Sequence, residues 1–248
     1  MYFANAVRTE LQYPFNMAGH LISLALYYWL HAIFFDTIAF ISPTLNASNK
    51  WIELFLYSYV TVSIGTEVFA ASINSFFRSL TRGAADPYLT KPTSLLSLMF
   101  FRGAKPSYLI ILGVIGVLMF RGQIIYPLDL VAWAGWLAIV ALGIAANIFF
   151  ITALQALSFI TQRDLPIEYI HSEISAFAVV PTPFYPEIVS RWLTVALPML
   201  VAASIAANSI EYGYTFTTYA YLTSTVFIGI VSYASIKFLA AHYNSIGG

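Results

Sequence analysis

Long apolar runs alternate with short polar intervals along the whole chain. Runs at about 17–41, 51–77, 130–160 and 214–241 each contain roughly 25 residues or more, and an α-helix needs about 20 to cross a hydrocarbon layer of about 30 Å. A shorter apolar run begins at Tyr108 and continues to about residue 119. These runs predict transmembrane helices. The run at 130–160 is longer than a straight span requires, so we expect it to tilt or to project from the membrane.

Composition supports this interpretation. Of the 248 residues 60% are hydrophobic and 9% are charged, whereas about a quarter of a soluble domain is charged. No polar interval is long enough to form a core of its own, so we expect residues 1–248 to form a single all-α polytopic membrane domain. A net charge of zero, with the basic residues gathered in loops, argues against a nucleic-acid partner, because phosphate binding needs a continuous basic face. The chain has no Cys, which excludes disulfides and thiolate metal sites.

Residues 1–16 have the pattern of a helix that lies on a membrane surface. Apolar residues recur every four positions, at Phe3, Val7, Leu11 and Phe15, with polar residues between them. A segment this polar does not span a bilayer but can lie in its interface. We predict an interfacial helix, and a frayed terminus is the alternative.

The interval between Arg78 and Tyr108 determines the predicted orientation. It contains five of the eleven basic residues and a single acid, Asp86, and loops rich in Lys and Arg lie on the cytoplasmic side. The same orientation puts both termini in the cytoplasm. The basic residues then expected inside are Arg8, Arg78, Arg82, Lys91, Arg102, Lys105, Arg163 and Lys237, and those expected outside are Lys50, Arg121 and Arg191.

Within residues 78–105, helix-breaking residues surround a short amphipathic piece. Gly and Asp-Pro interrupt the helix, and a second Pro bounds the piece that follows. A rigid, partly apolar knuckle of this kind suits docking by another protein, and a solvated basic loop is the alternative. The candidate contact residues are Arg82, Gly83, Asp86, Pro87, Tyr88, Leu89, Lys91 and Pro92.

The part of the chain from 165 to 208 can be threaded in two ways. In one, 165–180 is a surface helix and 187–208 is a span. In the other, 165–180 crosses the membrane and 181–208 dips into the outer leaflet as a hairpin bounded by Pro186 and broken at Pro198. A re-entrant backbone is stable only beside protein or a water-filled cavity, so the second threading predicts a cavity nearby.

Ionisable residues within the apolar runs are candidates for function, because burying them in lipid is costly. Glu67 has no neighbouring cation in the sequence and should face a cavity or a subunit interface. Glu168, His171 and Glu173 lie in the first turns of the fifth helix, where the helix dipole already favours acids. All four are candidates for a translocation path.

Two further expectations concern uncharged side chains. His31, Asn74, Asn147 and Gln155 should form hydrogen bonds between helices, the common use of such residues in membranes. Trp29, Trp51, Trp133 and Trp136 lie toward the ends of runs and should be anchors in the interface, with simple packing inside the bundle as the alternative.

Three segments resemble a known family. The run Arg82-Gly-Ala-Ala-Asp-Pro-Tyr-Leu-Thr-Lys-Pro92 is similar to the G-x-x-D-x-x-L-x-x-P signature of permeases of the ABC type-2 exporter class, in its six-span branch. The stretch from Pro186 to Pro198 is similar to a Pro-bounded element of that family, and residues 243–247 resemble its closing Y-x-S-x-G. An aromatic pair that the family often has near the end of its fourth helix matches less well here.

The resemblance implies an N-terminal connecting helix, six spans, a coupling helix between the second and third spans, and a re-entrant outer hairpin before the sixth. It also implies that two such subunits, identical or homologous, pair in the bacterial cytoplasmic membrane. Each would dock its coupling helix into a cytoplasmic ABC ATPase and move a hydrophobic or amphiphilic substrate. On this basis the second threading is the expected one.

The sequence contains no G-x-x-x-x-G-K-[ST] phosphate loop, so ATP and Mg would bind to a partner subunit and no cofactor to this chain. A secondary transporter is the main alternative, although it should show matched helix breaks in two halves of the chain. An intramembrane enzyme is the other. The Glu168-x-x-His171 pair would need a second such pair to hold two metal ions, and no H-E-x-x-H or G-x-S-x-G motif is present.

Overall fold

The computed structural model describes residues 2–41, 49–82, 95–121, 130–161 and 165–242. Within these residues the regular structure is entirely helical. The helices are α1 (Tyr2–Gln12), α2 (Pro14–Ile41), α3 (Asn49–Thr81), α5 (Leu95–Phe101), α6 (Tyr108–Arg121), α7 (Leu130–Ile160), α8 (Ile167–Ser175), the 3₁₀ helices η1 (Ala176–Val179) and η2 (Thr182–Phe184), α9 (Glu187–Ala196), α10 (Pro198–Glu211) and α11 (Phe216–His242).

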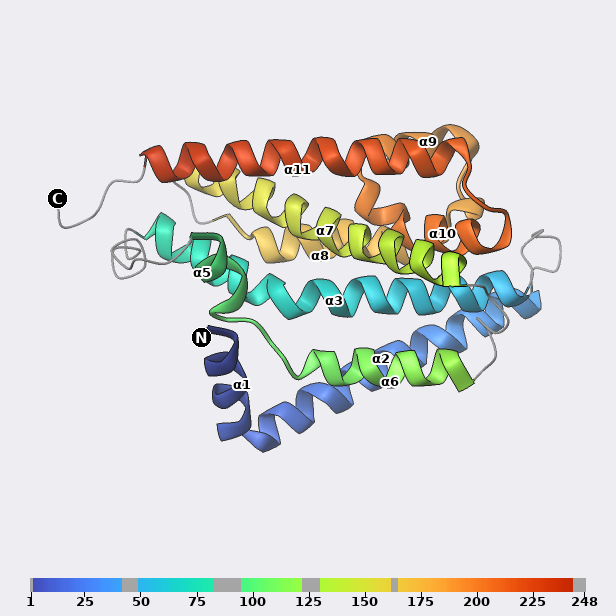
Figure 1. Ribbon diagram of the computed structural model, residues 1–248, viewed down its shortest axis with the longest axis horizontal. Coiled ribbons are helices and arrows are strands. Elements are labelled where there is room, and N and C mark those ends of the chain that lie inside the picture. Colours follow the sequence, from blue (N-terminus) through green and yellow to red (C-terminus); the bar gives the residue numbers. More distant parts are fainter. Residues whose placement is uncertain (1, 42–48, 83–94, 122–129, 162–164, 243–248) are drawn as a thin grey trace.

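Helix α7 lies at the centre of the bundle and packs against α3, α10 and α11 (Figure 1). A close contact among three of these helices is at Gly143. A Cβ atom placed there would lie 2.7 Å from the Cβ of Ala202 on α10 and 3.0 Å from Cγ2 of Val62 on α3. Membrane helices associate through such close contacts between small residues, because lipid gives them no hydrophobic drive to associate. The missing side chain therefore allows three helices to meet.

Helices α2 and α6 lie on the other side of α3 (Figure 1). Most large apolar side chains of α2 are exposed, among them Ile22, Leu26, Trp29 and Leu30. Such a surface is expected where lipid, and not water, surrounds a helix. Helix α11 has a similar exposed apolar face on the opposite side of the bundle.

The N-terminal helix forms as expected but is shorter. α1 ends at Gln12 and α2 begins at Pro14, where a proline costs no hydrogen bond because the first N–H groups of a helix have no partner within it. Phe3 packs edge-to-face on Phe101 of α5, with 6.2 Å between ring centroids. Phe15, expected in the apolar stripe of this helix, instead belongs to α2 and is exposed.

The loop between α5 and α6 is held tightly to both α3 and α1. The Gly103 N–H donates to Ser72 Oγ (2.9 Å) and the Lys105 N–H donates to the Val68 carbonyl (2.9 Å). The Glu10 carboxylate accepts from the Ser107 N–H (2.7 Å) and from the Ser107 hydroxyl (3.0 Å). The sequence did not reveal these contacts, because they join polar groups that are far apart in the chain.

Helices α9 and α10 form a sharply bent pair, with an angle of 112° between them. Met199 and Leu200 pack against Ala146, near the midpoint of α7. At the other end of α10, the Asn208 side chain accepts a hydrogen bond from the Trp51 indole (2.7 Å). α10 therefore runs from the middle of the bundle to the end at which α3 begins.

The segment between α8 and α9 is irregular, and side chains satisfy part of its backbone. The Thr182 N–H donates to Ser204 Oγ on α10 (3.0 Å), and the Tyr185 hydroxyl donates to the Phe177 carbonyl (3.0 Å). Because α8 begins beside the end of α3, where Arg78 meets Glu168, the chain runs through α8 and this segment from that end of the bundle to a contact with α10 at Ser204.

Among the described residues, four helices are long and apolar enough to cross a membrane, or five if the bent pair counts as one span. The four single helices are Pro14–Thr37, Lys50–Thr81, Leu130–Ser158 and Phe216–Leu239. α6 is apolar but shorter. The protein is thus an all-helical membrane protein, and a six-span count depends on how α6 and α8 are assigned.

The predicted anchor role is wrong for two tryptophans, which pack inside the bundle instead. Trp51 and Trp136 are 1% and 3% exposed and lie in the core, whereas Trp29 is exposed. The Trp136 indole donates to Ser58 Oγ on α3 (2.9 Å). A buried hydrogen-bond partner on a neighbouring helix explains why these indoles point inward.

The prediction of hydrogen bonds between helices is confirmed for one pair. Gln155 donates to Asn74 (2.8 Å) across two helices. His31 and Asn147 instead bond to the carbonyls of Tyr27 and Gly143, one turn earlier in their own helices.

Gly143→Val should destabilise the bundle, because the new side chain would overlap Ala202 and Val62. We expect a loss of about 1–3 kcal/mol, measured as a lower thermal midpoint of the purified protein. Gly116→Val on α6 is the control, since no heavy atom lies within 4 Å of a Cβ at that position. Equal effects of the two substitutions would contradict the packing described here.

Candidate functional site

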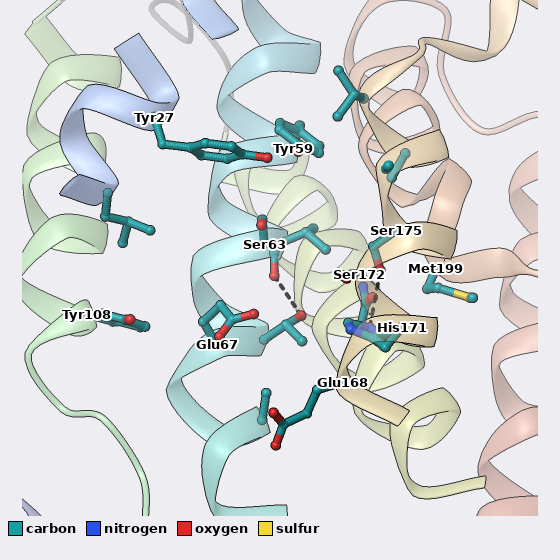
Figure 2. A pocket seen from close by; sticks show the side chains of 18 of the residues that line it. Tyr27, Tyr59, Ser63, Glu67, Tyr108, Glu168, His171, Ser172, Ser175 and Met199 are labelled. Carbon is teal, nitrogen blue, oxygen red and sulfur yellow. Dashed lines mark hydrogen bonds between the residues drawn. The ribbon is translucent and has the colours of Figure 1, made fainter. Parts of the chain in front are cut away.

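A cavity of ≈ 600 Å³ lies within the bundle. Its walls come from α2, α3, α8 with η1, and α10, and Tyr108 of α6 closes one side (Figure 2). The volume is within the range of small-molecule sites in proteins, about 300–1,000 Å³. A smaller cavity of ≈ 240 Å³, beside the end of α3 that carries Arg78, shares Asn74 and Glu168 with it.

Glu67 occupies the wall formed by α3, and its carboxylate points into the cavity (Figure 2). The side chain is half-buried. Lys105 and Glu168 act on it electrostatically, but within the described part of the chain the carboxylate has neither a hydrogen bond nor an ion pair. The sequence predicted that Glu67 would face a cavity or an interface, and the structure places it in a cavity.

Two of the three candidates on α8 reach the same cavity. Glu168 pairs with Arg78 of α3 (3.1 Å) and is 58% exposed, so it lies at an open mouth of the cavity. His171 lies deeper, with Nε2 3.2 Å from Ser175 Oγ (Figure 2). Glu173 is exposed and lies outside the cavity lining. The fold thus brings Glu67, Glu168 and His171 together and leaves Glu173 apart.

The end of the cavity away from Glu168 is aromatic. Tyr27, Tyr28 and Tyr59 line it, and the Tyr28 hydroxyl donates to Ser63 Oγ on α3 (2.7 Å). His31 stacks on Tyr59, with 5.7 Å between ring centroids. Sequence reasoning missed this group, because an aromatic residue in an apolar run looks the same whether it faces lipid, core or cavity. The adjacent residues Tyr27 and Tyr28 of α2 were the sequence feature that could have indicated an aromatic group here.

The structure describes only some of the remaining predicted site residues. Arg82 is exposed just after the last residue of α3. The other coupling candidates, Gly83 to Pro92, and the terminal motif at 243–247 lie outside the described residues. Pro186 caps the start of α9, and Pro198 occupies the first turn of α10, where it is buried.

The described residues do not gather into a metal site: nowhere in them do three or more His, Asp or Glu side chains group as one would require. What the cavity does provide is a half-buried carboxylate beside hydroxyl groups and tyrosine rings, open toward Glu168. This arrangement suits the binding and passage of a molecule.

A helical membrane protein with a polar cavity between its spans has the architecture of a transport component. Residues 21–247 match the family described as ABC-2 family transporter protein, and the chain therefore belongs to that family. The match confirms the resemblance found in the sequence and identifies the chain as a membrane component, a permease subunit, of an ABC system. No curated protein and no solved structure matches the chain.

The cavity can be tested by labelling, because the natural chain has no Cys. Ser172→Cys should react quickly with a water-soluble maleimide in permeabilised membranes, since Ser172 lines the cavity and is exposed. Ser232→Cys should react at least about ten-fold more slowly, because thiols without access to water are inert. Ser232 is 1% exposed and donates its hydroxyl hydrogen to the Phe149 carbonyl. Equal labelling rates would show that water does not enter the cavity.

Proposed function

We propose that this chain is the membrane subunit of an ATP-driven exporter of hydrophobic or amphiphilic molecules, with the cavity at Glu67 as part of the translocation path. The observation that carries the proposal is the meeting of Glu67, Glu168 and His171 in one cavity of a chain of this family. Charged groups within a membrane are expected to face a substrate or ion pathway.

The substrate class follows from the two surfaces of α2. Leu24, Tyr27 and Tyr28 line the cavity, while Ile22 and Leu26 are exposed on the outside of the bundle. An amphiphile in the membrane would therefore be separated from the cavity by a single helix. A cavity with an aromatic end and a charged mouth suits a molecule with an apolar body and a polar head.

In this proposal residues 1–248 form one permease domain with six spans. They are α2, α3, α6, α7, the α8–η1 segment and α11, and 181–208 is the outer hairpin. Support comes from the 112° bend at Pro198 and from the course of α10, which returns to the end where α3 begins. The backbone of this hairpin is also satisfied in part by its own side chains, since the Thr182 N–H donates to Ser204 Oγ.

Energy would enter through the coupling segment, 78–105, between α3 and α6. The chain has no phosphate loop, so an ABC ATPase partner would bind ATP and Mg and receive Gly83 to Pro92. The loop that follows is bonded to α3 at Ser72 and Val68 and to α1 through Glu10. A displacement of the coupling segment would therefore be transmitted to the helix that carries Glu67.

The complete transporter would contain a second permease subunit, either a copy of this chain or a homologue. It would reside in the bacterial cytoplasmic membrane, with residues 1–16 on the inner surface and both termini in the cytoplasm. The basic residues of 78–105 support this orientation.

ATPase association tests the proposal. The wild-type chain, expressed together with its neighbouring genes, should co-purify with a nucleotide-binding subunit. Asp86→Lys, which reverses a charge, and Tyr88→Ala, which removes an apolar contact, should each reduce the amount of bound ATPase at least about ten-fold.

Both variants should still insert and accumulate in the membrane like the wild type. Asn5→Ala on the exposed part of α1 serves as a matched surface substitution that should not change ATPase binding. Absence of any ATPase from the purified wild type would contradict the exporter assignment, and full ATPase binding by both variants would contradict the coupling role of 82–92.

A further inference from the structure

The uncharged hydrogen-bonding groups of the cavity offer both acceptors and donors. The hydroxyl hydrogens of Thr66 and Ser172 are donated to the carbonyls of Val62 and Tyr169, which leaves their oxygens as acceptors. Ser63 instead accepts from the Tyr28 hydroxyl, so its own hydrogen remains available. The charged groups and the aromatic rings therefore decide which ligand the cavity favours.

The charged groups around the cavity favour a cation. Arg78 already pairs with Glu168, and Lys105 holds its ammonium over the Tyr108 ring, 5.4 Å from the centroid. The Glu67 carboxylate has no ion pair within the described structure, although Lys105 influences it electrostatically. His171 has its Nε2 atom 3.2 Å from Ser175 Oγ. One half-buried carboxylate is thus left without a cation at contact distance.

Aromatic rings complete the site. Four tyrosines line the cavity, Tyr27, Tyr28, Tyr59 and Tyr108, and in Figure 2 Tyr108 lies to one side of Glu67, while Tyr27 and Tyr59 lie toward the upper end of the view. Tyrosine rings attract organic cations through their negative faces, and the attraction increases when water is excluded. A carboxylate among tyrosines is the combination of groups that recognises an alkylated or arylated cation.

We propose that this cavity binds an organic cation, with the positive centre at Glu67 and the apolar body against the tyrosines. The inference rests on the proposed function in one respect, that the cation would be the class of molecule exported. Binding itself requires only the cavity of this chain. The positive charge of Lys105 repels a cation bound at Glu67 and therefore weakens its binding.

Two ions of the same shape and opposite charge provide the test. Tetraphenylphosphonium and tetraphenylborate are measured for equilibrium binding to the full-length protein in lipid nanodiscs, with empty nanodiscs as the blank. Wild-type protein should bind the phosphonium at least about ten-fold more tightly than the borate after this correction. Glu67→Gln should abolish that preference.

Two further variants keep the result interpretable. Glu173→Gln removes an acid from the same region outside the cavity lining and should bind like the wild type. Lys105→Met should tighten phosphonium binding about three-fold, because it removes the opposing charge. This gain is expected even if Glu67→Gln fails to fold.

Equal binding of the two ions, preference for the borate, or no binding above empty nanodiscs would overturn the inference. Unchanged phosphonium binding in Glu67→Gln, or weaker binding in Lys105→Met, would overturn it as well. These outcomes leave the exporter assignment intact, since that depends on ATPase association. Conversely, if the chain binds the cation but recruits no ATPase, the exporter assignment is overturned and the cation site stands.

Discussion

The close packing of α7 against α3 and α10 is the contact on which the rest of the structure depends. At Gly143 the side chains of Ala202 and Val62 come directly against the α7 backbone, and Ala202 and Ala206 on α10 are also small and buried. In lipid, helices gain little from hiding apolar surface, so close contact between small residues holds them together. This packing is what allows α10, a short helix that begins at Pro198, to lie inside the bundle beside α7.

The cavity is a consequence of that arrangement. Because α10 fills only part of the bundle, the space between α3 and α8 is left for polar groups, and Glu67 and His171 occupy it. A carboxylate in lipid would be costly, whereas a cavity open at Glu168 gives it access to water and to a ligand. The loop bonded at Gly103 and Lys105 fixes the same part of α3 from outside. The candidate site and the proposed route by which the ATPase acts on the permease therefore both involve helix α3.

The long spans could be predicted from the sequence, because twenty or more apolar residues can satisfy their backbone in lipid only as helix. Residues 130–160 were placed correctly to both ends. The inward position of Trp51 and the aromatic end at Tyr28 could not be predicted, because they depend on partners on other helices. Glu67 was found because an unpaired acid in a span is costly wherever it lies. Its position beside His171 required the fold.

We propose above all that the transported molecules pass Glu67 and that ATP hydrolysis drives this transport. The most direct measurement is the flux of labelled tetraphenylphosphonium across proteoliposomes that contain the purified complex. We expect transport that requires ATP and that falls at least about ten-fold in Glu67→Gln while ATP hydrolysis by the bound partner continues. Transport that proceeds without ATP, or at an unchanged rate in Glu67→Gln, would contradict the account.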